Sequence, residues 1–205
     1  MKHITQRELL DADKQYRTNL MNCLSGPRMA VLVGTTNGAG HTNLAIFNST
    51  LHIGAHPPLV GLIFRPDSVD RHTLTNIRTT GQYTINAVGM HFYEQAHHTS
   101  ARYPAEISEF DAAGLSPQYS NRMKAPYVGE STLRFGLTLR EEVPIQSNGT
   151  WLVIGEVQEI WLKAVLLKDD GSLRLDQAGI VAAGGLDHYY GLEFLSALPY
   201  AKPKM

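Results

Sequence analysis

The sequence predicts a mainly β protein whose strands form a closed antiparallel barrel with a few peripheral helices. Short runs of alternating apolar and polar residues are separated by Gly, Pro and Asn turn signals over most of the chain. Within residues 30–64 no helical pattern lies between the expected strands, although a parallel sheet needs such helices as crossovers. Many short strands with few helices therefore favour a closed antiparallel barrel.

The N-terminal residues predict a helical arm over about residues 5–25. Thr5-Gln6-Arg7-Glu8 has the pattern of a capping box, and Gly26-Pro27 follows as a stop signal. Cys23, the single cysteine, is expected to be buried near the helix end, and a single thiol excludes an internal disulfide. We expect the arm to pack against the sheet through apolar residues along one face, which are Leu9, Tyr16, Leu20 and Leu24.

Three strands are expected before residue 65, with turns at residues 37–40 and 57–58. They are Ala30–Thr36, a second strand that begins at Thr42 and runs to about Thr50, and Leu59–Phe64. A basic loop follows and opens a helix over about residues 71–79, with Ser68 or Asp70 as its cap. Gly81 is placed to end that helix in a left-handed conformation.

The second half of the chain predicts more strands around a loop-rich middle. Residues 82–88 and 133–139 alternate apolar and polar side chains, and a longer strand is expected from residue 150 to 160. Residues 90–100 are expected to be helical, and residues 102–126 to form loops with a short helix. Asp169–Ser172 has the composition of a hairpin turn.

Composition bounds the class of protein. The chain has 205 residues, 43% of them hydrophobic and 18% charged, which suits one domain spanning residues 1–205. Its net charge of −1 argues against nucleic acid as a partner. No apolar run has the length of a membrane span or a signal core, so we expect a cytoplasmic protein without a membrane partner. His52 and His56 lie on a strand and before a proline, so no metal site is expected.

Residues 65–73 suggest a phosphate site. The amides at a helix start carry partial positive charge, arginine offers a two-pronged donor and hydroxyls add short hydrogen bonds. The alternative is a solvated loop with a capped helix, in which Asp67 and Asp70 neutralise the arginines. The candidate residues are Arg65, Ser68, Arg71, His72 and Thr73.

The neighbouring strand suggests a site for a flat, amide-rich ring. Ala45 is small enough for a ring to lie close to the backbone, while backbone amides and Asn side chains can pair with a carbonyl and imide edge. The alternative is an amphipathic strand whose polar side faces water. Flavin mononucleotide (FMN) joins such a ring to a phosphate. The candidate residues are Thr42, Asn43, Leu44, Ala45, Phe47, Asn48, Ser49 and Phe64.

An ordered set of segments over about residues 25–190 resembles the flavin reductase-like, FMN-binding split-barrel family, which has flavoredoxin-like members. The segments are Gly26-Pro27-Arg28, Val31–Thr36, Thr42–Ser49, Pro57–Val60, Arg65-Pro66, His72–Ile77, Gly81, Ile85-Asn86, Ser108–Phe110, Gly114-Leu115, Ala125-Pro126, Leu152–Val157 and Gly184–Tyr189. Two departures are Arg71, where many relatives have Lys, and Ala182-Ala183, where relatives often have an arginine-containing segment.

This resemblance implies a six-stranded antiparallel split barrel that forms a homodimer with FMN near the subunit interface. The phosphate would lie by Arg65, Arg71, His72 and Thr73. The isoalloxazine ring and ribityl chain would lie by Asn43, Leu44, Ala45 and Ser49.

The expected function is flavin reduction, with hydride transferred from NADH or NADPH to flavin. Hydride transfer needs no acid–base residue, and no catalytic residue is assigned. Alternatives are a flavoredoxin-like electron carrier, an FMN-binding protein without its own NAD(P)H reaction, and a barrel for another phosphorylated ligand. The candidate donor contacts are His98, Arg102, Tyr103, His188 and Tyr189.

Overall fold

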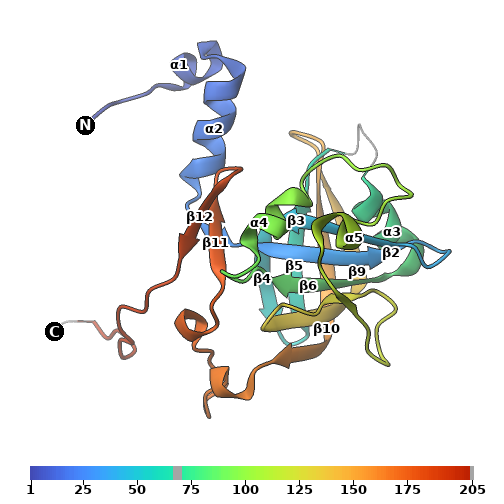
Figure 1. Ribbon diagram of the computed structural model, residues 1–205. Coiled ribbons are helices and arrows are strands. Elements are labelled where there is room, and N and C mark those ends of the chain that lie inside the picture. The colour runs from blue at the N-terminus through green and yellow to red at the C-terminus, as the bar shows by residue number, and fades with distance from the viewer. Residues whose placement is uncertain (67–70, 204–205) are drawn as a thin grey trace.

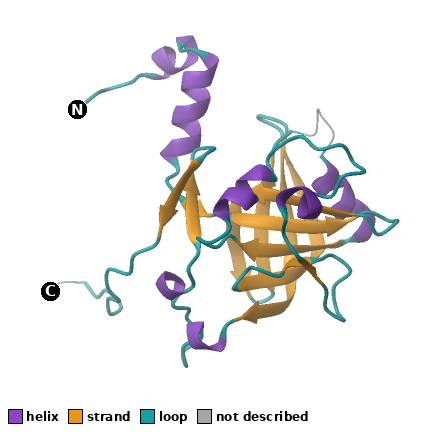
Figure 2. Ribbon diagram, in the orientation of Figure 1, coloured by secondary structure: helices purple, strands orange, loops and turns teal. Residues whose placement is uncertain are grey.

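A curved antiparallel sheet of seven strands forms the body of the computed structural model, which describes residues 1–66 and 71–203 (Figures 1 and 2). The strand order is β3-β2-β6-β9-β10-β5-β4, and all neighbours are antiparallel. The mainly β prediction is confirmed. The strands are β2 (Val31–Thr36), β3 (Thr42–Phe47), β4 (Thr50–Ala55), β5 (Pro58–Phe64), β6 (Gln82–Ala87), β9 (Leu133–Ile145) and β10 (Thr150–Leu162).

The seventh strand arises because the second predicted strand is two strands. The chain turns at Asn48-Ser49, so that β3 pairs with β2 at one end of the sheet and β4 pairs with β5 at the other. Ser49 fixes this turn, since its hydroxyl donates to the Ile63 carbonyl oxygen at 2.8 Å. The two strands of this segment thus lie at opposite ends of the strand order, which is the opening of the split barrel.

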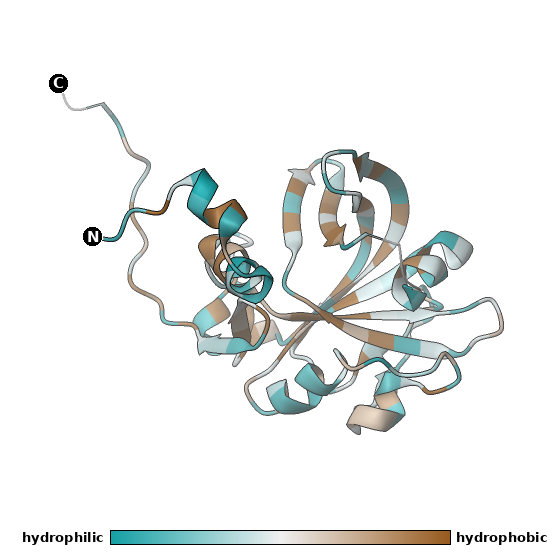
Figure 3. Ribbon diagram, turned by 90° about the horizontal axis from the view of Figure 1, so that it is seen from above, coloured by the Kyte–Doolittle hydropathy of each residue, from teal (hydrophilic) through white to brown (hydrophobic). Residues whose placement is uncertain are grey.

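Bulges and small residues allow the sheet to curve. The register shifts at Ile154/Gly155 and Val157/Glu159, where β10 pairs with β9. Figure 3 shows hydrophobic and hydrophilic residues alternating along the curved strands. The inward side chains form one core cluster, which includes Val33, Leu62, Phe64, Ile85, Leu137 and Val153.

A smaller sheet and short helices surround the barrel. The sheet joins β1 (Arg28–Met29), β11 (Val181–Gly184) and β12 (His188–Gly191). A second core cluster lies outside the barrel and unites β3, α4, α5 and this sheet. The remaining elements are α3 (His72–Thr80), α4 (Tyr93–His98), α5 (Glu109–Ala113), β7 (Pro117–Gln118), β8 (Tyr127–Val128), η1 (Ala164–Leu166) and η2 (Leu175–Gln177).

Helix α3 begins one residue after its predicted start. Arg71 occupies the cap position and makes no side-chain cap hydrogen bond. The predicted caps, Ser68 and Asp70, lie outside the described residues. Gly81 ends the helix at φ 69°, in the left-handed region, as predicted. At residues 169–172 the predicted hairpin is reduced to a turn with one bridge, Leu167 to Leu173, between 3₁₀ segments.

The N-terminal arm does not pack against the sheet, so that prediction was wrong. The capping box of Thr5 and Glu8 is present, but Asp13 caps a second helix and divides the arm into α1 (Gln6–Asp11) and α2 (Lys14–Leu24). Leu9 therefore lies on a different helix from the other apolar residues, and neither helix has a buried residue. Figure 1 shows α2 standing away from the barrel.

Cys23 is exposed, which contradicts its predicted burial. It lies at the end of α2, where the arm stands clear of the barrel core. None of the helices among the described residues combines the length and apolar character needed to span a bilayer.

Gly155→Ala should destabilise the barrel by about 1–3 kcal/mol. A Cβ at this position would collide with the hydroxyl and ring of Tyr83, which is fully buried and fixed by the core. Urea unfolding measures the change. Gly191→Ala is the control, because nothing lies within 4 Å of its new Cβ.

Adding Tyr83→Phe to Gly155→Ala should restore part of the lost free energy of unfolding. The Tyr83 hydroxyl is the nearest atom to the new Cβ, and it has no hydrogen-bond partner among the described residues. A Gly155→Ala protein as stable as the wild type would contradict this account of the packing.

Candidate functional site

A buried hydrogen-bond network joins the predicted ring strand to the predicted phosphate helix. The Asn43 amide of β3 donates to the Thr73 hydroxyl of α3 at 3.0 Å. It also donates to the Thr35 hydroxyl of β2 at 3.4 Å, and the Asn76 amide reaches the same hydroxyl at 3.1 Å. All four side chains are buried. The two predicted segments are thereby held together in space.

A small polar cleft of about 80 Å³ opens beside this network. Typical pockets for whole organic ligands are larger, about 300–1,000 Å³, so this cleft suits a compact polar group. Three of the predicted residues, Thr42, Asn43 and His72, line it together with His41, Asn76 and Ile107.

The predicted cations lie around the start of α3. Arg65 is exposed. Arg71 is half-buried, and its Nε donates to the Pro66 carbonyl oxygen at 3.3 Å. His72 is half-buried at the first position of α3. The fifth candidate of this loop, Ser68, lies outside the described residues.

Several predicted ring residues are already engaged by the protein. Leu44 is fully buried, and its amide donates to Glu109 Oε2 at 2.8 Å. Phe64 is buried in the barrel core with its ring 5.0 Å from that of Phe47. Ala45 is half-buried, and its methyl side chain takes part in none of these hydrogen bonds or ring contacts. It therefore remains the candidate for a position where a ring can lie close to the strand.

The turn after β3 connects the ring strand to the smaller sheet. The Asn48 amide donates to the carbonyl oxygens of Ala183 and Gly185 at 3.4 and 3.3 Å. Arg28 Nε donates to the Asn48 carbonyl oxygen at 2.6 Å. Arg28 had no predicted role, although it belongs to the Gly26-Pro27-Arg28 segment of the family resemblance.

Glu109 is a second residue that sequence reasoning missed as part of the site. The Ser108 hydroxyl lies 2.6 Å from the Thr42 hydroxyl, so α5 is attached to β3 by two consecutive residues. Burial raises the pKa of the Glu109 carboxyl above its ordinary value of 4.5, while the Leu44 amide and His72 act in the opposite direction. The only signal in the sequence was the helix start at Ser108-Glu109-Phe110.

The predicted donor contacts fall into two groups. His98 and Tyr189 line a second cleft of about 320 Å³ between α4 and β12. His188 lies beside it and pairs with Asp187 at 2.8 Å. Arg102 is exposed and Tyr103 half-buried on the loop after α4, and neither lines this cleft.

Among the described residues, no group of three or more His, Cys, Asp and Glu side chains is placed to hold a metal ion. The polar chemistry of the site comes instead from amides, hydroxyls, imidazole and guanidinium groups.

Comparison with known proteins identifies the family. Residues 24–174 match the model of the flavin reductase like domain. This chain belongs to the flavin reductase-like family. A crystal structure from Shewanella frigidimarina, assigned as a flavin reductase with a split barrel domain, is 43% identical, covers 98% of this chain and 100% of that chain, and gives a TM-score of 0.94. The resemblance inferred from the sequence is confirmed.

More distant structures share the fold. Nitrilotriacetate monooxygenase component B from Bacillus cereus is 21% identical, with 97% of this chain and 98% of that chain covered and a TM-score of 0.85. The flavoredoxin of Desulfovibrio vulgaris is also 21% identical, with 98% of each chain covered and a TM-score of 0.78. The split-barrel architecture of the flavin reductase-like family is therefore common to all of them.

Glu109→Gln should change how stability depends on pH. A carboxyl group with a raised pKa in the folded protein adds stability below its unfolded pKa, and this contribution is lost as the pH rises through the folded pKa. The free energy of unfolding of the wild type, minus that of Glu109→Gln, should thus fall as the pH rises from below 4.5 through the raised pKa of the folded carboxyl. Urea unfolding at several pH values measures this difference. Glu106→Gln, an exposed neighbour, is the control, and a difference that rises with pH would contradict the burial argument.

Proposed function

We propose that this protein binds FMN and reduces flavin with NADH or NADPH. The observation that carries the proposal is the hydrogen bond from Asn43 to Thr73, which holds the amide-bearing strand against the cationic helix start. Membership in the flavin reductase-like family supports the same reading.

The donor set of the basic loop fits a phosphate. Arg65 and Arg71 supply guanidinium groups, and His72 and Thr73 stand in the first turn of α3, where the helix dipole favours an anion. Ser68, which lies outside the described residues, remains a proposed hydroxyl donor to the phosphate on the basis of the sequence alone. The compact polar cleft that His72 lines is of a size for such a group, while Arg65, Arg71 and Thr73 are not among its lining residues.

The strand and turn next to this cleft fit the ring and its chain. Ala45 leaves room beside β3, and the Asn48 and Ser49 region supplies polar groups at the turn. Thr42, Asn43 and Phe47 lie on the same strand. Leu44 and Phe64 are buried in the two core clusters that pack against β3, so they would position the strand rather than contact the ring.

Bound FMN would supply the hydride-accepting chemistry. The protein's own residues then have three tasks, which are to bind the phosphate, to orient the ring and to exclude water from the reacting face. No acid or base is needed for them, and no catalytic residue is proposed. His98, His188, Tyr189, Arg102 and Tyr103 remain proposed donor contacts, and the proposed location is the cytoplasm.

We also propose that two copies form a homodimer. The exposed apolar side chains support this, because Leu24, Leu195, Leu198 and Tyr200 are all more than half exposed on the arm and the C-terminal segment. The molar mass in solution, measured by light scattering, tests the pairing against the 22.7 kDa of one chain.

An electron carrier is the second candidate, favoured by the fold shared with a flavoredoxin. Anaerobic mixing with FMN and either NADH or NADPH separates the two candidates. The visible absorbance of the flavin should disappear at an enzymatic rate with at least one donor, and much faster than without protein. Bleaching by dithionite alone would instead support the carrier. The same assay with FAD measures the choice of flavin.

Replacing Arg65 and Arg71 together with alanine should weaken FMN binding far more than riboflavin binding, because only FMN carries the phosphate. Each change alone should cost about 1–3 kcal/mol of FMN binding. Fluorescence titration with both ligands measures the difference. Arg7→Ala with Lys168→Ala removes the same charge elsewhere on the chain and is the control. Equal losses for FMN and riboflavin would show that the basic loop is not a phosphate site.

A further inference from the structure

We propose that the cleft between α4 and β12 binds the nicotinamide end of the donor and prefers the ring in its oxidised, positively charged form. This inference rests on the proposed function and adds a location and a preference to it. The predicted consequence is inhibition by the oxidised product.

The cleft has the size of a ring-binding site. Its volume of about 320 Å³ is four times that of the polar cleft near α3, and it lies at the lower end of the usual range for organic ligands. It is lined by Tyr93, Glu94, His97, His98, Asp187 and Tyr189.

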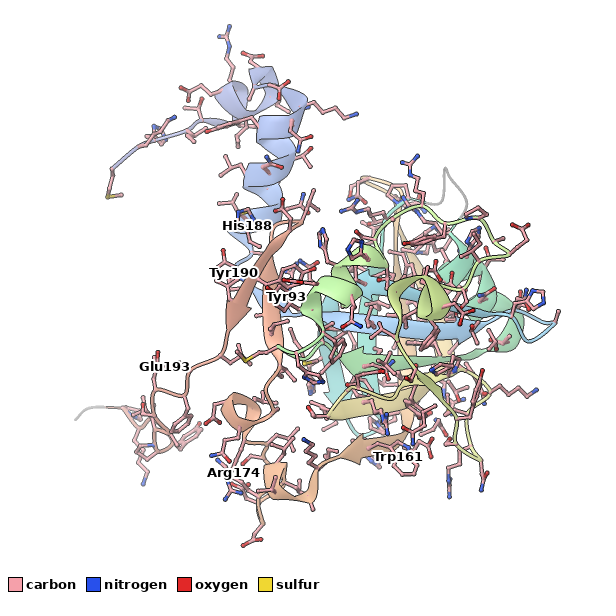
Figure 4. All side chains as sticks on the ribbon, in the orientation of Figure 1. Tyr93, Trp161, Arg174, His188, Tyr190 and Glu193 are labelled. Atoms are coloured by element: carbon pink, nitrogen blue, oxygen red, sulfur yellow. The ribbon has the colours of Figure 1, made fainter. Side chains whose placement is uncertain are left out.

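One wall of the cleft is aromatic and held in place. The Tyr189 ring lies 5.4 Å from the Tyr93 ring and 5.8 Å from the His97 ring, which it meets nearly edge-on at 84°. The Tyr189 hydroxyl and His97 Nδ1 are hydrogen-bonded at 3.0 Å. In Figure 4 Tyr93 extends from α4 toward the hairpin that carries His188 and Tyr190. These rings need little reordering to receive a flat ligand.

The charges of the cleft favour a cation. Glu94 and Asp187 lie on its lining, where Glu94 Oε1 accepts from the Tyr93 hydroxyl at 3.1 Å and Asp187 Oδ1 lies 2.8 Å from His188 Nδ1. Each carboxylate keeps a second oxygen for a cation, and the aromatic faces also attract positive charge. Burial, followed by the charge of Asp187, raises the pKa of the Tyr189 hydroxyl, which therefore stays neutral. A pyridinium ring is a flat cation, whereas a dihydropyridine ring is neutral. The same carboxylates would repel a phosphate, so the ring end of a dinucleotide fits better than its diphosphate.

The cleft adjoins the strand proposed to hold the flavin. Ile46 of β3 packs in the same apolar cluster as Tyr93 and Tyr189. The Asn48 amide donates to the Gly185 carbonyl oxygen, two residues before Asp187. A nicotinamide ring in the cleft would thus lie on the Ile46 side of β3, whose other side carries Asn43 and Ala45. It would meet a flavin at the free edge of this strand.

Glu94→Gln combined with Asp187→Asn tests the charge preference. At about pH 8, the inhibition constant of the oxidised dinucleotide should rise about tenfold. The KM for the reduced donor should change less than about threefold, because the neutral ring gains little from the carboxylates. Glu106→Gln combined with Glu141→Gln removes two exposed carboxylates elsewhere and should leave both constants unchanged.

A ring replacement tests the aromatic wall. Tyr189→Leu keeps an apolar side chain but removes the ring and its bond to His97, so it should weaken both nicotinamide forms. Tyr190→Leu, at the adjacent and more exposed position of β12, is the matched control. Urea unfolding of both variants shows whether each remains folded.

Binding of 1-methylnicotinamide, a pyridinium cation without phosphate, separates this inference from the proposed function. Quenching of tyrosine fluorescence should report binding to the wild type and about tenfold weaker binding to the carboxylate double variant. Binding that is equal in both proteins, or absent from the wild type, would overturn the inference. FMN titration and donor bleaching test the proposed function independently, and their failure alongside normal 1-methylnicotinamide binding would refute the reductase but not the cleft.

Discussion

Asn43 donates a buried hydrogen bond to Thr73, and the geometry of the candidate flavin site depends on that contact. Both side chains are removed from water, so leaving either one unpaired would cost about 1–3 kcal/mol. The bond crosses from the edge of the sheet to the first turn of α3, and Thr35 and Asn76 extend it. One polar network therefore sets the position of the helix start relative to the strand, without any covalent link between them.

Local patterns in the sequence predicted the elements whose stability is local. The alternation at residues 82–88 and 133–139 gave the strands, and Gly81 gave the end of α3, because a two-residue period and a left-handed glycine act within a few residues. The prediction for the N-terminal arm was wrong because a local pattern there is compatible with two structures. Asp13 can cap a helix as readily as it can lie within one. Because it caps α2, Leu9 lies in α1 and does not share a helix face with Tyr16, Leu20 and Leu24.

The sequence allowed residue types of the candidate site to be selected, but not the contacts between them. Asn43, His72 and Thr73 could be selected as polar residues near a helix start, and the fold places them together. The partnership of Glu109 with the Leu44 amide spans 65 residues, and that of Asn48 with Gly185 spans 137. Nothing in a local pattern specifies such contacts, so Glu109 and Arg28 became visible only in three dimensions.

Strand β3 presents a different neighbour on each side. Asn43 turns toward the buried network of α3, while Leu44 and Ile46 pack in the cluster shared with α4 and the hairpin. Because side chains alternate along a strand, inserting a single residue here without a bulge would exchange the two sides for the rest of β3. Insertions tolerated within β3 should therefore be of two residues, or of one residue with a bulge like those of β10.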